Sequence, residues 1–453
     1  MKAIAAISTP PGYGGIGIIR ISGEDSFKII EKIFIPLNKK KVEGYTIKYG
    51  HIVDFNGNKI DEVLVSYFKK PKSFTTENMC EINSHGGPIV VRQILELCIE
   101  AGARIAEPGE FTKLAFLNGR IDLAQAEAVI EMINAKTKKE KDASMKQLDG
   151  ELSKKINKIR KEMLNIMADI EASIDYPEYD IEEITKNNVR EVLKKSKKEL
   201  LNLKQTFENG KIIRNGINMA IIGKPNAGKS SLLNSILNEE RAIVTDIEGT
   251  TRDIIEEYFI IDGIPVKIID TAGIRNKTED KIEEIGIKKA KKIAKEADLV
   301  VYIIDNTKGI DEEDLEVLDN IKEKKGIIVF NKIDLEKNTN IEKIKKYHFS
   351  VIKISTKIKT GIEELKGKIS EIFKLGEINI DDSTTIINER HKEIIINSMK
   401  NIEKGIDAID NNMPIDIISI SIRQTIEELG KITGQTASED IINEIFKKFC
   451  LGK

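Results

Sequence analysis

The spacing of hydrophobic residues changes along the chain, and each change predicts a different kind of structure. Up to about residue 118, short β-branched runs at 15–22, 61–68 and 80–84 alternate with turn residues. One amphipathic helix interrupts them at 90–102. This pattern predicts an N-terminal α+β domain.

From about residue 123, hydrophobic residues recur three and four positions apart, which is the spacing of amphipathic helices. The stretches with this spacing are 123–140, 153–174, 189–207, 389–409 and 418–433. They predict a second domain that is mostly α-helical.

Between the helical stretches, hydrophobic strands alternate with helical segments, which is typical of a parallel α/β sheet. The strand-like runs are 217–223, 266–273, 297–305, 326–334 and 351–356. Because helical segments flank this block on both sides, we expect it to be inserted into the helical domain.

The expected fold is therefore a multidomain α/β protein. Its N-terminal α+β domain would cover residues 1–118, and the inserted domain would cover 216–375 with a mixed, mainly parallel sheet. The helical domain would be built from 119–215 and 376–453.

The composition of the chain limits which classes of partner, such as nucleic acids or membranes, it is expected to bind. Charged residues make up 32% of the 453 residues, but the formal net charge is only -2, so no global positive field would draw the chain onto nucleic acid or an anionic membrane. No run approaches the roughly 20 apolar residues of a membrane span. We expect a cytoplasmic protein without a membrane or DNA partner. Cys80, Cys98 and Cys450 are scattered, which favours reduced thiols.

Residues 223–230 read GKPNAGKS and fit the phosphate-binding pattern G-x-x-x-x-G-K-[ST], directly after a strand and before a helix. Backbone N–H groups from Asn226 to Lys229 would form an anion-binding nest at the helix N-terminus. Lys229 would neutralise the β- and γ-phosphates, and the Ser230 hydroxyl would bind Mg²⁺. The stretch predicts a nucleoside triphosphate site.

Residues 331–334 read NKID at the end of another strand, at the sheet edge where ligands bind in such folds. The Asp334 carboxylate can accept hydrogen bonds from N1–H and the 2-amino group of guanine, which adenine does not offer in that arrangement. Asn331 would support the loop, Lys332 would lie along the base, and residues 355–357 would donate backbone hydrogen bonds to O6. We therefore expect GTP rather than ATP.

Two segments between these motifs have the order of GTPase switches. In the segment 245–253, Thr251 is the candidate for the second hydroxyl that binds Mg²⁺. In the segment 270–273, Asp270 would lie in the outer shell of the metal, and the backbone amide of Gly273 would contact the γ-phosphate. The residues expected to contact GTP are Asn226, Ala227, Gly228, Lys229, Ser230, Ser231, Thr245, Asp246, Ile247, Glu248, Gly249, Thr250, Thr251, Asp270, Thr271, Ala272, Gly273, Asn331, Lys332, Asp334, Ser355, Thr356 and Lys357.

Ile274 follows the glycine of this DTAG segment, where many GTPases carry a glutamine that orients the attacking water. The motifs alone therefore leave open which group activates the water.

The chain resembles one family, the tRNA-modifying GTPases called MnmE or TrmE, over essentially its whole length. Outside the common GTPase motifs, the resemblance rests on four stretches. They are 9–23, 73–88, 106–129 and 449–453. The resemblance implies a folate-binding-like N-terminal domain and a Ras-like G domain inserted in a helical domain. It also implies a homodimer through the N-terminal domains and a complex with an FAD-containing MnmG (GidA) partner.

The reaction implied by the family takes place on tRNA. The complex would add a carboxymethylaminomethyl or aminomethyl group at C5 of the wobble uridine of certain tRNAs. The carbon would come from 5-formyl-tetrahydrofolate or a related reduced folate.

The family further implies potassium-dependent dimerisation of the G domains during hydrolysis. A fixed K⁺ would stand where other GTPases place an arginine that is worth about 10³- to 10⁵-fold in rate. The expected K⁺ ligands are Asn226, Thr245, Ile247 and Thr250. The alternative is that Asn226 only caps the loop.

The resemblance points to Glu283 as the residue that acts on the attacking water. Together with Lys229, it is one of two expected catalytic residues. The segment is one residue longer than the usual family form, so Glu284 is a competing assignment. A solvated charge on a helix face is the structural alternative for Glu283.

The folate contacts implied by the resemblance are Arg20, Glu81, Arg120 and Lys453. Arginine can bind a carboxylate through two hydrogen bonds, and a glutamate can pair with the two-donor edge of a pterin. Position 120 is more often lysine in the family, so Arg120 keeps the charge but changes its geometry. Cys450, near the basic terminus, is either a possible nucleophile or an inert thiol.

A different class of function stays open from the sequence. A ribosome-assembly or RNA-binding switch GTPase would share the nucleotide motifs but perform no covalent chemistry on RNA. Such a protein is expected to carry an RNA-binding module, for example a KH domain with its GXXG loop, and we find none. A membrane-linked switch is a third class, and no spanning segment supports it.

Overall fold

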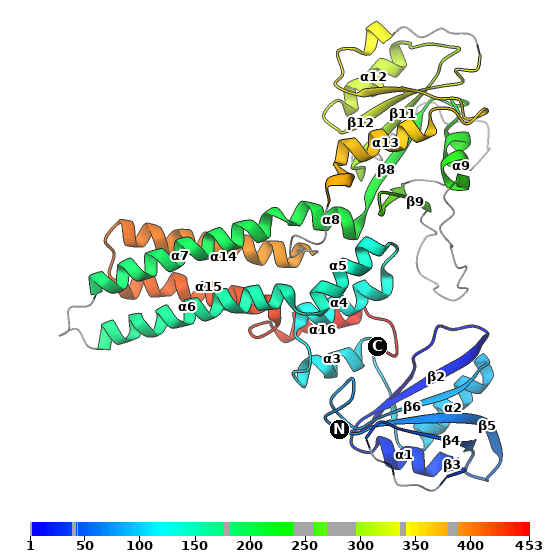
Figure 1. Cartoon of the computed structure of the whole chain (residues 1–453), viewed down its shortest axis with the longest axis vertical. Helices are drawn as coiled ribbons and strands as arrows, with labels where there is room; N and C mark the ends of the chain where they lie inside the picture. Colours follow the sequence, from blue (N-terminus) through cyan, green and yellow to red (C-terminus); the bar gives the residue numbers. More distant parts are fainter. Residues whose placement is uncertain are drawn as a thin grey trace.

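The computed structural model describes residues 2–38, 42, 44–175, 182–239, 257–269, 296–335, 341–378 and 388–453. Figure 1 shows three bodies: an N-terminal domain, an elongated helical domain, and an α/β domain on the other side of the helices α4 and α5. No helix within these ranges combines the length and the apolar character that crossing a membrane requires.

The N-terminal domain is one sheet of seven strands with two helices on it. The strand order is β3-β4-β5-β6-β2-β1-β7. Ile21 and Ile82 of the sheet pack with Ile30 and Ile94 of the helices in one core. The bounds are β1 Ile4–Ile7, β2 Gly14–Ser22, α1 Ser26–Ile33, β3 Phe34–Pro36, β4 Thr46–Val53, β5 Lys59–Phe68, β6 Met79–Gly86, α2 Pro88–Glu100 and β7 Arg104–Ile105. The predicted α+β character is confirmed.

The helical domain joins segments from both sides of the α/β domain. Helices α6, α7, α14 and α15 bury their apolar faces in a common core (Figure 1). Helix α3, Glu110–Leu117, falls within the span predicted for the N-terminal domain and packs on both domains, since Phe111 clusters with Ile4 and Phe116 with Leu123. The bounds of the other helices are α4 Leu123–Asn134, α5 Lys138–Leu148, α6 Glu151–Asp175, α7 Glu182–Gln205, α8 Phe207–Asn215, α14 Glu389–Asp410, α15 Ile415–Thr433 and α16 Glu439–Lys447.

The helical stretch predicted at 123–140 is split into α4 and α5. Thr137 is extended, and its side chain accepts a hydrogen bond of 3.1 Å from the backbone N–H of Glu140. Threonine favours such a cap over a helix interior, because its hydroxyl satisfies a backbone donor that the first turn leaves unpaired. The chain therefore turns back here, and α5 packs against α4.

The inserted domain is a six-stranded sheet with the order β13-β12-β11-β8-β10-β9, parallel except for the antiparallel β9–β10 pair. Helices α9 and α13 pack on one face and α12 on the other. The bounds are β8 Ile217–Gly223, α9 Lys229–Glu239, β9 Glu257–Ile261, β10 Ile264–Ile268, β11 Leu299–Asp305, α12 Glu312–Ile321, β12 Gly326–Asn331, η2 Ile341–Ile344, β13 Ser350–Lys353, α13 Ile362–Phe373 and η3 Leu375–Glu377. The predicted mixed, mainly parallel sheet is confirmed.

The chain enters this sheet through a tight turn. Gly216 follows α8 with a φ of 71°, and a Cβ there would lie 2.2 Å from the carbonyl oxygen of Pro265. Only glycine fits both the conformation and the space. The turn places β8 beside β10 and aims its carboxyl end at the phosphate-binding loop.

Candidate functional site

The loop between β8 and α9 wraps around the side chain of Lys229. The Lys229 ammonium donates to the carbonyl oxygens of Gly223, at 2.7 Å, and Lys224, at 2.8 Å. Burial lowers the pKa of Lys229. The positive charge predicted to meet the phosphates therefore lies inside the loop, at the N-terminus of α9.

Gly228 lets this loop approach the NKID segment. Its φ is 102°, and a Cβ would lie only 2.0 Å from Nδ2 of Asn331. That nitrogen donates to the carbonyl oxygen of Ala227 at 2.9 Å. Any side chain at position 228 would displace Asn331.

Asn331 also holds the base-recognition segments together. It is 1% exposed, and its Oδ1 accepts from the backbone N–H groups of Lys332, at 2.8 Å, and Thr356, at 3.2 Å. One buried amide thus connects the phosphate loop with both segments predicted to bind guanine.

Asp334 is exposed and oriented by its neighbour. The Ser355 hydroxyl donates to its Oδ1 at 2.6 Å, and this hydrogen bond keeps the pKa of Asp334 below its ordinary value. An ionised carboxylate at this edge can accept the two donors of guanine. The geometry fits the predicted guanine site.

The structure adds Asp305, which sequence reasoning missed. Asp305 ends β11 directly opposite Asn331, and its Oδ2 accepts from the Lys332 ammonium at 2.6 Å. Its other oxygen accepts from the hydroxyl of Thr307 at 2.7 Å. The sequence could have identified Asp305 by its position, because the strand-like run 297–305 ends at the same sheet edge as NKID.

Lys224 is a second missed residue. Its ammonium forms ion pairs with Asp311, with Glu313 at 3.2 Å and with Asp314 at 3.5 Å. The three carboxylates lie at the start of α12. Lys224 therefore ties the phosphate loop to the neighbouring helix.

Several predicted site residues lie outside the described residues. They are Thr245, Asp246, Ile247, Glu248, Gly249, Thr250, Thr251, Asp270, Thr271, Ala272, Gly273 and Glu283, together with the competing Glu284. Of the expected metal ligands, Ser230 and Asn226 are described. Ser230 is the second residue of α9, and Asn226 has a left-handed φ of 60° in the loop before it. Their hydroxyl and amide oxygens suit hard cations such as Mg²⁺ and K⁺.

The N-terminal domain holds a cavity of about 600 Å³, called the N-terminal cavity below. Its lining residues are Tyr45, Phe68, Pro71, Lys72, Ser73, Phe74, Thr76, Met79, Glu81, Asn118, Gly119 and Arg120. Two of the four predicted folate contacts, Glu81 and Arg120, are among them. The volume and the mixture of rings and charges suit an aromatic, anionic ligand.

Arg20 lies beside this cavity and fixes Glu81. The two residues are opposite each other on β2 and β6, and the Arg20 Nε and Nη2 atoms lie 2.9 and 2.8 Å from Oε1 of Glu81. The ring of Phe74 lies under both guanidinium groups, 5.7 Å from that of Arg20 and 4.8 Å from that of Arg120. Phe74 was not predicted, because a single phenylalanine in a loop carries no signal in the sequence.

The C-terminal residues complete the cluster. The carbonyl oxygen of Gly452 accepts from Arg20 Nη1 at 3.2 Å and from the Ser8 hydroxyl at 3.1 Å. Burial and the nearby positive charge of Arg20 lower the pKa of Lys453. All four predicted folate contacts therefore lie close together. Cys450 is exposed, and its carbonyl oxygen accepts from the backbone N–H of Gly109 at 3.3 Å.

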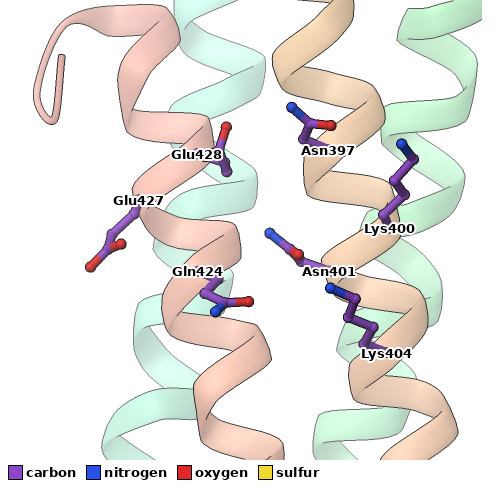
Figure 2. A pocket seen from close by; sticks show the side chains of 7 residues that line it. All are labelled: Asn397, Lys400, Asn401, Lys404, Gln424, Glu427 and Glu428. Carbon is purple, nitrogen blue, oxygen red and sulfur yellow. The ribbon is translucent and has the colours of Figure 1, made fainter. Parts of the chain in front are cut away.

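A polar groove of about 390 Å³ lies on the helical bundle, away from these residues. Its lining residues carry charges of both signs, Lys400 and Lys404 on α14 and Glu427 and Glu428 on α15. In Figure 2, Asn401 of α14 and Gln424 of α15 lie between the two helices, whereas the Glu427 side chain points away from α14. Charges of both signs on neighbouring helices are typical of a solvated surface. None of the predicted site residues lines this groove.

Known proteins and family models match almost the whole chain. A family model described as the MnmE helical domain matches residues 123–450, and one described as the GTP-binding protein TrmE N-terminus matches residues 3–120. The tRNA modification GTPase MnmE of Acetivibrio thermocellus is 53% identical over 99% of both chains. The chain belongs to the MnmE family of tRNA modification GTPases.

A second relative agrees with this assignment. MnmE of Clostridioides difficile strain 630 is 49% identical over 99% of both chains. A structure of Era from Aquifex aeolicus is 30% identical over 41% of this chain and 66% of that chain, with a TM-score of 0.27. As a member of the MnmE family, the chain is a GTP hydrolase, which confirms the class of enzyme predicted from the nucleotide motifs.

Proposed function

We propose that this MnmE-family chain is a K⁺-dependent GTPase that works with an FAD-containing MnmG-type partner on tRNA. Together they would add a carboxymethylaminomethyl or aminomethyl group at C5 of the wobble uridine, using a folate one-carbon unit. The observation that carries the proposal is the cluster of Arg20, Glu81, Arg120 and Lys453 at the N-terminal cavity, on the same chain as a guanine nucleotide site.

The residues at the N-terminal cavity fit a reduced folate. Glu81, held by Arg20, would accept hydrogen bonds from the pterin edge, and Phe74 offers a face for ring stacking. Arg120 and Lys453 would bind the carboxylates of the glutamyl group. When bound, the folate supplies the one-carbon unit.

In the G domain, the chain's own groups would position the phosphates. Lys229 would neutralise their charge, and Glu283, or its neighbour Glu284, would orient the attacking water. Ser230 and Thr251 would hold Mg²⁺, and the ligands of K⁺ would be Asn226, Thr245, Ile247 and Thr250. When bound, both ions supply positive charge beside the phosphates.

The N-terminal sheet supports a homodimer. Ile47 and Tyr49 of β4 and Leu64 of β5 are exposed, and Tyr49 lies opposite Leu64 in the strand register. Apolar side chains gathered on one sheet face favour an interface with a second protein surface. We propose a second copy of this chain as its partner.

The proposed reaction is tested by mass analysis of wobble nucleosides in tRNA from cells that lack the protein. The modified uridine should disappear and return on complementation with the wild type but not with Glu81→Gln. Unchanged wobble nucleosides would favour a ribosome-assembly or RNA-binding switch GTPase.

The proposed role of potassium is tested separately by GTP turnover in KCl and NaCl at equal ionic strength. Turnover should be faster in KCl, and Asn226→Ala should remove the difference. Equal turnover of the wild-type protein in both salts would exclude K⁺ from the mechanism.

A further inference from the structure

The β9–β10 hairpin connects the two segments that are expected to respond to the nucleotide. β9 begins at Glu257, four residues after the segment 245–253, and β10 ends at Ile268, just before the segment 270–273. Tyr258 and Lys267 lie opposite each other at the end of the hairpin that both segments share. The pair therefore lies within one residue of the hairpin ends to which both segments are joined.

The helical domain contacts the same hairpin through α5 and the residues before it. The Lys136 ammonium lies 4.9 Å from the ring centroid of Tyr258, a distance typical of a cation–π interaction. At the turn of the hairpin, a Cβ on Gly263 would lie 3.3 Å from the side chain of Lys139. Ala143, one turn further along α5, is buried in the core of the G domain.

Electrostatic contacts strengthen this junction. Burial raises the pKa of Glu140, while the charges of Lys136 and of Lys267 act in the opposite direction. The Lys139 ammonium also donates to the carbonyl oxygens of Leu375, at 3.4 Å, and Ile378, at 3.3 Å, where the chain leaves the G domain. The start of α5 therefore contacts both the β9–β10 hairpin and the exit of the domain.

The two helices α4 and α5 pack against each other as an antiparallel pair, called the α4–α5 hairpin below. The side-chain amide of Gln125 donates to the carbonyl oxygen of Leu148 at 2.7 Å, and that of Gln147 donates to Ala124 at 2.8 Å. These bonds lock the start of α4 to the end of α5. The 12 residues of α4 make the pair about 18 Å long.

The other end of the α4–α5 hairpin carries part of the N-terminal cavity. Asn118, Gly119 and Arg120 line that cavity and directly precede the start of α4. Asn118 donates to the carbonyl oxygen of Thr75 at 2.7 Å, and Arg120 donates to that of Phe74 at 2.9 Å. In Figure 1 the α4–α5 hairpin lies between the G domain and the N-terminal domain.

Open space also borders the junction. A cavity of about 1060 Å³ lies where the helical and G domains meet, and Lys136, Glu140 and Lys267 are among its lining residues. Lys267 of the β9–β10 hairpin borders this space, whereas Phe259 and Val266 of the same strands are buried in the core of the G domain.

We propose that the α4–α5 hairpin acts as a strut that couples the nucleotide state of the G domain to the affinity of the N-terminal cavity for folate. Lys136 and Tyr258 form its contact with the G domain, and Asn118 and Arg120 form its contact with the cavity. This inference rests on the proposed folate site. Because coupling between two binding sites is reciprocal, folate must change the affinity for the GTP analogue by the same factor.

The test measures binding of 5-formyl-tetrahydrofolate to the full chain by calorimetry, in the presence of GDP or of a non-hydrolysable GTP analogue. The wild type should show a difference of about fivefold or more between the two states. Lys136→Ala and Tyr258→Ala should reduce it to less than about twofold, while Tyr258→Phe and Lys136→Arg, which keep the ring and the cation, should retain it. Lys138→Ala, an exposed lysine on the same helix, is the matched control and should behave as the wild type.

The outcomes separate the two proposals. Folate binding of equal affinity in both nucleotide states overturns the strut and leaves the proposed function intact. Coupling that survives in Lys136→Ala and Tyr258→Ala also overturns it. If no folate binds in either state, the proposed function fails, and the strut fails with it.

Discussion

Arg390 binds the carboxylate of Glu127 through two hydrogen bonds, of 3.0 and 2.7 Å, although 263 residues separate them. Glu127 lies on α4, before the G domain, and Arg390 lies on α14, after it. The guanidinium also donates to the carbonyl oxygen of Lys431 at 2.7 Å. Burial lowers the pKa of the neighbouring His391. This buried cluster joins the two halves of the helical domain.

Arg390→Ala should destabilise the helical domain strongly. It removes the guanidinium from the buried Glu127 carboxylate, which keeps only the contact of 2.9 Å with His391 Nε2, and breaking a buried ion pair typically costs about 3–5 kcal/mol. Urea unfolding followed by circular dichroism measures the loss. Lys158→Ala, which breaks the exposed ion pair with Glu199, is the control and should cost less than about 1 kcal/mol. Equal losses in the two variants would contradict the structural role of Arg390.

Glu131 should make the protein less stable as the pH rises. Burial raises the pKa of this carboxyl from 4.5 to about 7. Between these values the folded chain holds a proton that the unfolded chain has released, so the free energy of unfolding falls with rising pH. Glu131→Gln removes the titration and should be more stable than the wild type by about 3 kcal/mol at pH 8, with little difference at pH 4. Parallel unfolding profiles from pH 4 to 8 would refute this prediction.

Gly228→Ala should weaken GTP binding. The added methyl group would lie 2.0 Å from Nδ2 of Asn331 and would force Asn331 out of its contacts with the phosphate loop. Losing these buried hydrogen bonds predicts a fall in affinity of about 10- to 100-fold. Fluorescence titration with a labelled GTP analogue measures it. Gly367→Ala on α13, where a Cβ meets no atom within 4 Å, is the control and should bind like the wild type.

Gly452→Ala should reduce folate binding without changing GTP hydrolysis. The residue has a φ of 86°, and its Cβ would lie 2.3 Å from the carbonyl oxygen of Ile7. The C-terminal residues must then move and carry Lys453 away from Arg20, which predicts a loss of about tenfold in folate affinity. Leu451→Ala, at an exposed neighbour, is the control. Wild-type folate affinity in Gly452→Ala would show that the C-terminal residues make no contribution.

Patterns of neighbouring residues were sufficient to predict the elements that are formed by contiguous stretches of the chain. The phosphate loop and the NKID segment are contiguous, so spacing alone predicted their positions beside β8 and β12. β9 was missed, because its short run 257–261 lies directly against β10. Thr137 was read as part of a helix, since its capping role depends on the fold of the following turn.

Pairs that are distant in the sequence could not be predicted from it. Neither Asp305 with Lys332 nor Glu127 with Arg390 has a spacing that links its two members. The pairing of Arg20 with Glu81 depends on the register of β2 and β6, and both residues were selected only through the family resemblance. Periodicity identifies buried faces, but it does not say which face meets which.

The division of the helical domain also has a consequence for its synthesis. Helices α6 and α7 leave the ribosome well before α14 and α15, with the whole G domain in between. At about 5–20 residues per second, the roughly 170 intervening residues delay completion of the bundle by about 10–35 seconds. During that time the apolar faces of the first two helices await their partners, so this protein should depend on a chaperone in the nascent state more than a chain whose domains are contiguous.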